Sequence, residues 1–185
     1  FESMRASLFL MMASFHENEE SSATSLVLNI KDRSSSRYFS QSSIPEKVAK
    51  LVYLAGFLPR TGESLLSLAK QQKPSKFSSP MQIVSDQHVI YFPATKIRPF
   101  GYNQCDDDVF SAIESFLGPE PFLPWIGAVQ ISKERYGSVS RVYIECEQDN
   151  AIHLLSQQRM HSLSPCEVFR LNSDHSPFYS DPKGL

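Results

Sequence analysis

The chain has 185 residues, of which 41% are hydrophobic and 21% charged, as in an ordinary globular protein. This length suits a single domain over residues 1–185, and the net charge of −2 argues against nucleic-acid binding, which usually needs a basic patch. The longest apolar run, from Ala6 to Phe15, is too short to span a bilayer, so it predicts a buried helix and no membrane partner.

The cysteines and histidines show no spacing typical of ligands. The three cysteines, an odd number at wide spacing, argue against a disulfide framework and favour a reducing, cytoplasmic compartment. The sequence contains no Cys-x-x-Cys or His-Glu-x-x-His motif, so we expect neither a metal site nor a cofactor. None of these patterns predicts an oligomeric state.

The first half of the chain is uneven. Ser25–Leu28 is a short apolar run that predicts a buried strand, and residues 29–43 are polar, rich in serine and without a clear period. Leu51–Ala55 is a continuous apolar run, typical of a parallel strand that is covered on both faces. Gly56–Pro59 ends that strand, and the leucine spacing within Glu63–Gln71 predicts a helix.

Residues 72–139 indicate an insertion of mixed structure. Within it, His88–Phe92 predicts a strand, and Asp106–Leu117 predicts a helix whose three acidic residues in the first turn suit the helix dipole. Three prolines surround a shorter apolar piece that contains Trp125.

The last part of the chain is regular again. Arg141–Cys146 and Glu167–Leu171 predict strands, and Ala151–Met160 predicts the helix between them. Asp181 is expected to open a final helix. Because strands alternate with a helix here, we expect a parallel sheet with right-handed crossovers.

Two polar side chains follow neighbouring strands of this predicted sheet. Asp149 comes just after the strand ending at Cys146, and His175 just after the strand ending near Leu171. The carboxyl ends of parallel strands open on one edge, so Asp149 can accept the imidazole Nδ1 proton and orient His175 as a base. Two alternatives stay open: His175 is an ordinary surface residue, or Asp149 or Asn150 caps the following helix.

Several segments resemble one family. Residues 141–152 (Arg-Val-Tyr-Ile-Glu-Cys-Glu-Gln-Asp-Asn-Ala-Ile) resemble the triad-acid segment of the α/β-hydrolase group that contains plant methylesterases, hydroxynitrile lyases and bacterial esterase relatives. Residues 173–178 (Ser-Asp-His-Ser-Pro-Phe) resemble its triad-histidine loop. Residues 50–59 and 62–65 resemble the strand and turn after its nucleophile helix, and residues 136–139 resemble the approach to its acid strand.

The resemblance implies an α/β-hydrolase fold, in which a mostly parallel sheet carries helices on both faces and an inserted cap covers the pocket. The cap would comprise about residues 72–135, and the N-terminal part of the fold would be incomplete or divergent. Asp149 and His175 would be the triad acid and base. Trp125, Phe178 and Ser176 are candidates to contact a small apolar ester, although core packing explains Trp125 and Phe178 equally simply.

One part of the family pattern is missing. Triad hydrolases present their serine in Gly-x-Ser-x-Gly, and all seven glycines of this chain fall at position 56 or later, in no such motif. The family's usual spacing puts Lys31 where the serine belongs. We consider three explanations: a degenerate enzyme, a fragment or rearranged chain, or a nucleophile on a divergent turn, for which Ser34, Ser35 and Ser36 are the candidates.

The function implied by the resemblance is hydrolysis of a small carboxylic ester through an acyl-serine intermediate. The missing motif leaves the activity of this chain open, and the first alternative is a catalytically inactive binding or interaction protein on the same fold. The second is a hydroxynitrile lyase. The resemblance implies a lysine directly after the triad histidine of such lyases, and here that residue is Ser176.

Overall fold

The main sheet forms a parallel core in the computed structural model, which describes residues 12–15, 49–72 and 80–185. Its strand order is β1-β2-β6-β7. The central strands β2 (Lys50–Leu54) and β6 (Ser140–Cys146) pair in parallel, as do β6 and the edge strand β7 (Glu167–Leu171). The parallel sheet expected from these three apolar runs is therefore confirmed.

The expectation of a helix over the first apolar run is wrong for its last four residues. Met12–Phe15 form strand β1, which pairs antiparallel with β2. A short apolar run without a clear period fits a buried strand as well as a buried helix, and pairing with a neighbouring strand decides between them. The predicted strand Ser25–Leu28 lies outside the described residues.

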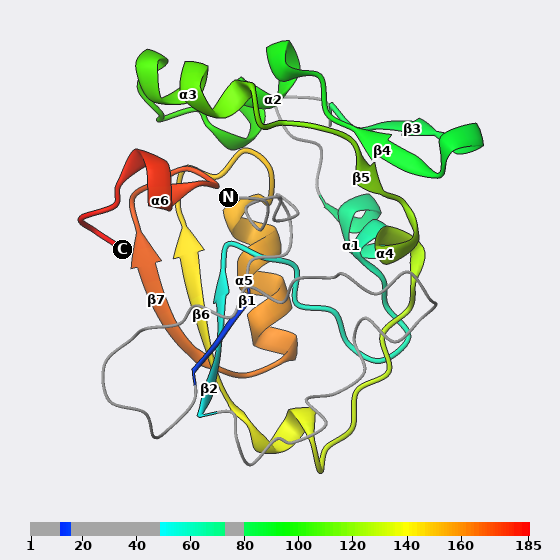
Figure 1. Cartoon of the computed structure of the whole chain (residues 1–185). Coiled ribbons are helices and arrows are strands. Elements are labelled where there is room, and N and C mark those ends of the chain that lie inside the picture. The colour runs from blue at the N-terminus through cyan, green and yellow to red at the C-terminus, as the bar shows by residue number, and fades with distance from the viewer. Residues whose placement is uncertain (1–11, 16–48, 73–79) are drawn as a thin grey trace.

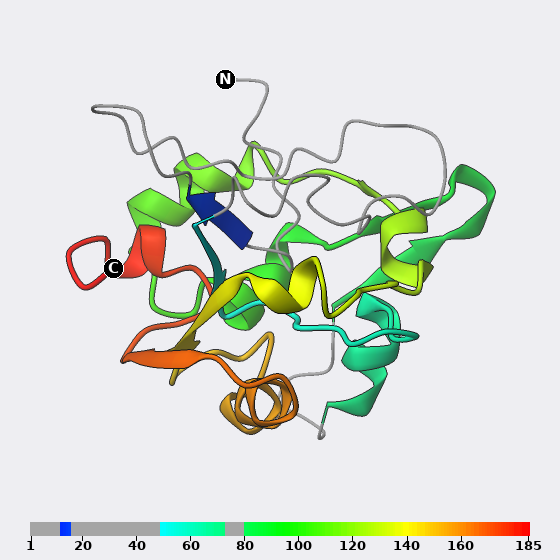
Figure 2. The same ribbon diagram turned by 90° about the horizontal axis from the view of Figure 1, so that it is seen from below.

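The two faces of the sheet bury different side chains. Alternation along the strands puts Tyr53 and Tyr143 on one face, where their rings stack with centroids 6.4 Å apart. Helix α5 (Leu154–Leu163) covers this face (Figure 2). The ring of His161 in this helix lies 5.6 Å from that of Tyr143. Leu54, Cys146 and their neighbours point to the opposite face, where a smaller apolar cluster forms.

The helices begin and end where local hydrogen bonding permits. Helix α1 (Leu65–Gln71) starts with a capping box, in which the side chains of Ser64 and Ser67 each accept a hydrogen bond from the other's backbone N–H. Helix α6 (Pro177–Ser180) comes before Asp181, so the final helix expected to open at that residue is wrong. Instead, Asp181 Oδ1 accepts a hydrogen bond from the backbone N–H of Gly184 in a turn, 3.0 Å away.

The insertion forms its own layer. Strands β3, β4 and β5 make a small antiparallel sheet, and α2 and α3 lie beside it beyond the carboxyl ends of β6 and β7 (Figure 1). Its elements are β3 (Gln82–Val84), β4 (Val89–Tyr91), α2 (Ala94–Gly101), α3 (Asp107–Glu114), β5 (Glu120–Pro121) and α4 (Leu123–Ile126).

Candidate active site

Two loops at the carboxyl edge of the sheet form the candidate site. One follows β6 and the other follows β7, and backbone hydrogen bonds hold them together: Glu147 N donates to Leu171 O at 2.9 Å, and Gln148 N donates to Ser173 O at 3.0 Å. These bonds continue the strand pairing past the last residues of the strands, so the two loops lie in a fixed register.

The two loops bring Asp149 and His175 into contact. His175 Nδ1 lies 2.8 Å from Asp149 Oδ2, and both side chains are buried. An ionised carboxylate can only accept, so this hydrogen bond requires the proton on Nδ1. The contact predicted from the positions of these residues after β6 and β7 is present, and it is the arrangement that orients an imidazole for proton transfer.

Asp149 also makes the capping contacts of the alternative interpretation. Its Oδ1 accepts hydrogen bonds from the backbone N–H groups of Ala151 and Ile152, at 2.7 and 2.8 Å. The carboxylate therefore closes the turn that leads into α5 with one oxygen and holds His175 with the other. Capping and pairing occur together, and the capping bonds fix the direction in which Oδ2 points.

Gln157 on α5 is a further site residue that the sequence reasoning missed. It is fully buried, and its Nε2 lies 3.3 Å from Asp149 Oδ2 and 2.7 Å from the carbonyl oxygen of Ile152. Its Oε1 accepts the backbone N–H of Cys146 at 3.0 Å, which fixes the orientation of the amide. The sequence feature that could have identified Gln157 is its spacing of three residues from Met160, which puts a polar residue on the buried side of α5.

This pair lies in a buried part of the described structure. Burial raises the pKa of the Cys146 thiol to about 12. Burial also raises the pKa of Tyr143 well above its ordinary value, and the nearby charge of Asp149 adds to the effect. Both shifts indicate that the carboxylate lies in a region of low polarity, where its hydrogen bonds are stronger than in water.

The other candidate residues lie in different settings. Ser176 is buried directly after His175 at the start of α6. Phe178 packs against the small cluster of Leu54, Ala55 and Cys146. Ser34, Ser35 and Ser36 lie outside the described residues.

Trp125 is part of the main core. Its ring centroid lies 6.5 Å from that of Phe57 and 6.1 Å from that of Phe92, and its Nε1 donates to Glu120 Oε2 at 3.4 Å. This environment matches the core-packing alternative, and a contact with substrate stays a prediction.

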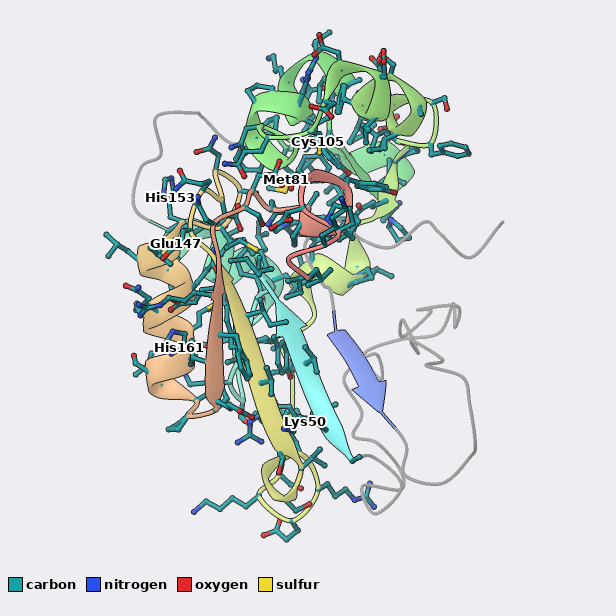
Figure 3. The ribbon with its side chains drawn as sticks, turned by 90° about the vertical axis from the view of Figure 1, so that its left-hand side faces the viewer. Lys50, Met81, Cys105, Glu147, His153 and His161 are labelled. Carbon is teal, nitrogen blue, oxygen red and sulfur yellow. The ribbon has the colours of Figure 1, made fainter. Side chains whose placement is uncertain are left out.

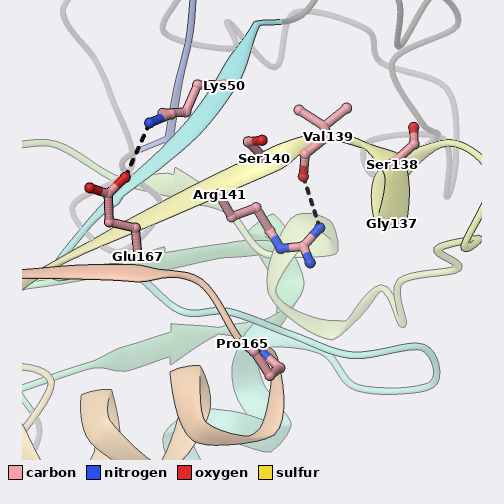
Figure 4. Close-up of a pocket in the computed structure, with 8 residues that line it drawn as sticks. All are labelled: Lys50, Gly137, Ser138, Val139, Ser140, Arg141, Pro165 and Glu167. Atoms are coloured by element: carbon pink, nitrogen blue, oxygen red, sulfur yellow. Dashed lines mark hydrogen bonds and ion pairs between the residues drawn. The ribbon is translucent and has the colours of Figure 1, made fainter.

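A pocket of about 400 Å³ lies at the other end of the sheet, where β2, β6 and β7 begin (Figure 4). It is lined by Lys50, Glu167 and Arg141 among others, with an ion pair of 3.2 Å between Lys50 Nζ and Glu167 Oε2. Figure 3 shows Lys50 at the end of the sheet opposite Cys105 and the insertion. This pocket is therefore remote from Asp149 and His175.

The described ranges contain neither a metal-binding cluster nor a membrane-spanning helix. Residues 12–15, 49–72 and 80–185 hold no group of three or more His, Cys, Asp or Glu side chains placed to bind a metal ion. None of the helices in the same ranges is long and apolar enough to cross a membrane.

No family model matches the chain, but individual proteins do. Putative methylesterase 13, chloroplastic, of Arabidopsis thaliana is 32% identical over 157 residues, which are 80% of this chain and 35% of that protein. Putative methylesterase 11, chloroplastic, of the same plant is 30% identical over 157 residues, which are 80% of this chain and 40% of that protein. The chain thus spans little more than a third of the length of these relatives.

Solved structures share its fold. A pyrethroid hydrolase from Sphingobium faniae superposes with a TM-score of 0.64 at 21% identity, over 75% of this chain and 58% of that one. Polyneuridine aldehyde esterase superposes with a TM-score of 0.63 at 20% identity, over 80% of this chain and 62% of that one. The sequence relatives and the structural neighbours agree, and the chain is a homologue of the plant methylesterases with the α/β-hydrolase fold.

Proposed function

We propose that the chain carries the acid and base of an esterase site that hydrolyses small carboxylic esters. The observation that carries this proposal is the buried hydrogen bond of 2.8 Å between His175 Nδ1 and Asp149 Oδ2. Asp149 would hold the imidazole in the Nδ1–H tautomer and stabilise the imidazolium that forms during reaction.

His175 would act twice in the reaction. It would first take the proton of a serine hydroxyl that attacks the ester carbonyl, and the acyl-serine forms as the alcohol leaves with that proton. It would then deprotonate water, which releases the acid and regenerates the serine. Ser34, Ser35 and Ser36 remain the candidates for this serine, because the sequence has no Gly-x-Ser-x-Gly motif.

The substrate would be small and largely apolar. Methyl jasmonate esterase 1 of Vitis vinifera is 37% identical over 57 residues, and its name specifies a methyl ester of a small acid. We infer that residues 72–135 act as a cap above the carboxyl edge, and that Phe178 and Ser176 face the substrate. No cofactor is needed for this chemistry. The expected cytoplasmic location stays a prediction, and several relatives carry the word chloroplastic in their names.

A chimera tests the acid and base separately from the missing serine motif. Residues 1–48 are replaced by the matching segment of Putative methylesterase 13. The whole of that relative is assayed as the positive control. We expect the chimera to hydrolyse p-nitrophenyl acetate and to lose that activity on His175→Ala and on Asp149→Asn. An active chimera that is unaffected by both substitutions would refute the assignment.

A catalytically inactive binding protein is the second candidate, and the absent serine motif favours it. An organophosphonate probe on the unaltered chain distinguishes the two candidates. Labelling of a serine, located by peptide mass spectrometry and abolished by His175→Ala, supports the enzyme. Absence of labelling, together with calorimetric binding of a small carboxylic ester, supports the binding protein.

A further inference from the structure

Asp174 is a fully buried carboxylate in the loop that carries His175. Its Oδ1 accepts hydrogen bonds from Ser180 Oγ at 2.7 Å and from the backbone N–H of Ser176 at 3.0 Å. Ser176 directly precedes α6 and Ser180 is its last residue, so this oxygen ties both ends of the short helix to the loop that carries His175.

The other oxygen of Asp174 reaches the insertion. Its Oδ2 accepts the backbone N–H of Gln104 at 2.8 Å and lies 3.9 Å from Cys105 Sγ. Burial, and next to it the charge of Asp174, raise the pKa of the Cys105 thiol to about 12, so the thiol keeps its proton and can donate. One carboxylate therefore joins two segments about seventy residues apart in the chain.

The same part of the insertion also contacts the acid loop. Asn103 Nδ2 donates to the carbonyl oxygen of Gln148 at 3.1 Å, and Asn150 Nδ2 donates to the carbonyl oxygen of Pro99 at 3.0 Å. The stretch of residues 99–105 runs from the end of α2 into the loop before α3. It is thus hydrogen-bonded to the loops on both sides of the Asp149–His175 contact. Figure 3 places Cys105 with the insertion, above the carboxyl ends of the strands.

We propose that Asp174 is a positioning residue that fixes residues 99–105 of the insertion to the histidine loop and thereby holds His175 against Asp149. The importance of His175 for catalysis rests on the proposed function, whereas the coupling between the insertion and the imidazole does not. In this arrangement residues 99–105 are a fixed support of the site, and any movement of the insertion that admits substrate has to occur elsewhere.

The donor pattern requires a carboxylate at this position. Both oxygens of Asp174 face donors, so an ionised carboxylate satisfies every contact, because it only accepts. In Asp174→Asn the shape is kept, but in either orientation the amide NH₂ faces two donors. This substitution therefore breaks one half of the contacts without leaving a cavity.

The test uses the intact 185-residue chain and compares Asp174→Asn with Asp181→Asn, which alters a half-buried carboxylate of the same segment. Amide hydrogen exchange reports on Gln104 and Ser176, and the imidazole ¹H and ¹⁵N resonances report on His175. We expect amide exchange to become about tenfold faster in Asp174→Asn at Gln104 or at Ser176, whichever backbone N–H then faces the amide NH₂, with loss of the His175 Nδ1–H resonance. The resonance of His161, which bonds to Glu145 elsewhere in the fold, serves as the internal control and should not move.

Unchanged exchange at both Gln104 and Ser176, or an unchanged His175 resonance, in Asp174→Asn would overturn the proposal. If Asp174→Asn does not fold, Ser180→Ala removes one donor to Oδ1 and should broaden the His175 Nδ1–H resonance. No change in that variant would equally overturn the proposal. The proposed function fails separately, if the resonances respond as expected while the chimera that carries a serine motif stays inactive.

Discussion

Two carboxylate–histidine contacts lie on β6 and its loop, with their carboxylates only four residues apart, and they have different surroundings. Asp149 follows the strand and meets His175 in the next loop. Glu145 lies within the strand, on the face covered by α5, and meets His161 Nε2 at 2.6 Å. Both carboxylate side chains are fully buried, so burial alone does not distinguish the proposed catalytic pair from the other contact.

The two carboxylates differ in the donors that contact them besides histidine. Glu145 Oε2 receives the charged guanidinium of Arg170 at 2.7 Å, so Glu145 joins β6, β7 and the last turn of α5. Within residues 12–15, 49–72 and 80–185, the donors to Asp149 besides His175 are uncharged, from backbone N–H groups and Gln157. A side chain within a strand is held between regular elements, whereas one at the strand end can use its oxygens to orient a loop histidine. Five predictions test this contrast.

The largest expected difference is in thiol reactivity, between the buried Cys105 and Cys146 near the candidate site and the more exposed Cys166 just before β7. Burial raises the pKa values of Cys105 and Cys146, near the candidate site, to about 12. At pH 8 their thiolate fractions are then about a thousandfold below that of an ordinary cysteine, because a raised pKa favours the protonated form. Timed iodoacetamide alkylation with mass spectrometry should modify the more exposed Cys166 first. Early modification of Cys146 would contradict the low polarity inferred around Asp149.

Gln157→Glu should be strongly destabilising. The introduced carboxylate would face Asp149 Oδ2 and the carbonyl oxygen of Ile152, which now accept from the amide. We expect a loss of about 4 kcal/mol in the free energy of unfolding, typical of an uncompensated buried charge. Urea denaturation measures this loss, and Gln158→Glu on the neighbouring position is the control. Equal effects of the two substitutions would mean that the amide of Gln157 does not support Asp149.

His161→Leu should cost about 2 kcal/mol, because it removes one of the two charged hydrogen bonds of buried Glu145. The double variant with Glu145→Leu should recover most of this loss, since no unpaired carboxylate then remains in the core. Urea denaturation of both variants and of the control Ser162→Ala checks the prediction. If the double variant has a lower free energy of unfolding than the single variant, Glu145 stabilises the fold through Arg170 alone.

Asp149→Asn should cost only about 1 kcal/mol, because Asn can keep the Oδ1 contacts with Ala151 and Ile152. Its amide NH₂ in place of Oδ2 would instead force His175 to accept at Nδ1, which changes the tautomer. The ¹⁵N shifts of the imidazole measure the tautomer directly. Retention of the Nδ1–H form would indicate that Asp149 does not set it.

The smallest expected effect is that of His175→Ala on the esterase activity of the otherwise unaltered chain. Without a serine in Gly-x-Ser-x-Gly, hydrolysis of p-nitrophenyl acetate should stay near background, and His175→Ala should change it little. Rapid turnover that His175→Ala abolishes would reveal a nucleophile elsewhere. Ser34, Ser35 and Ser36 would then be substituted in turn.

Residue patterns predicted the regular elements better than their ends. The edge strand Glu167–Leu171 matches in full, whereas α5 begins at Leu154, three residues later than expected. The turn closed by Asp149 delays the helix, and that turn is a side-chain contact that periodicity does not report. Helix α2 was missed because Pro99 lies inside it, and proline usually marks the end of a helix.

The sequence by itself determined the parallel arrangement of β2, β6 and β7 and put Asp149 and His175 at one edge of that sheet, where the two side chains can meet. Both follow from apolar runs of strand length and from the rule that the carboxyl ends of parallel strands open on one edge. Only the tertiary structure decided which buried polar groups support that meeting. Gln157 approaches from the helix face, and Asp174 reaches an insertion about seventy residues away in the chain. Hydrogen bonds of this kind depend on atomic positions to within a few tenths of an ångström, which residue spacing does not encode.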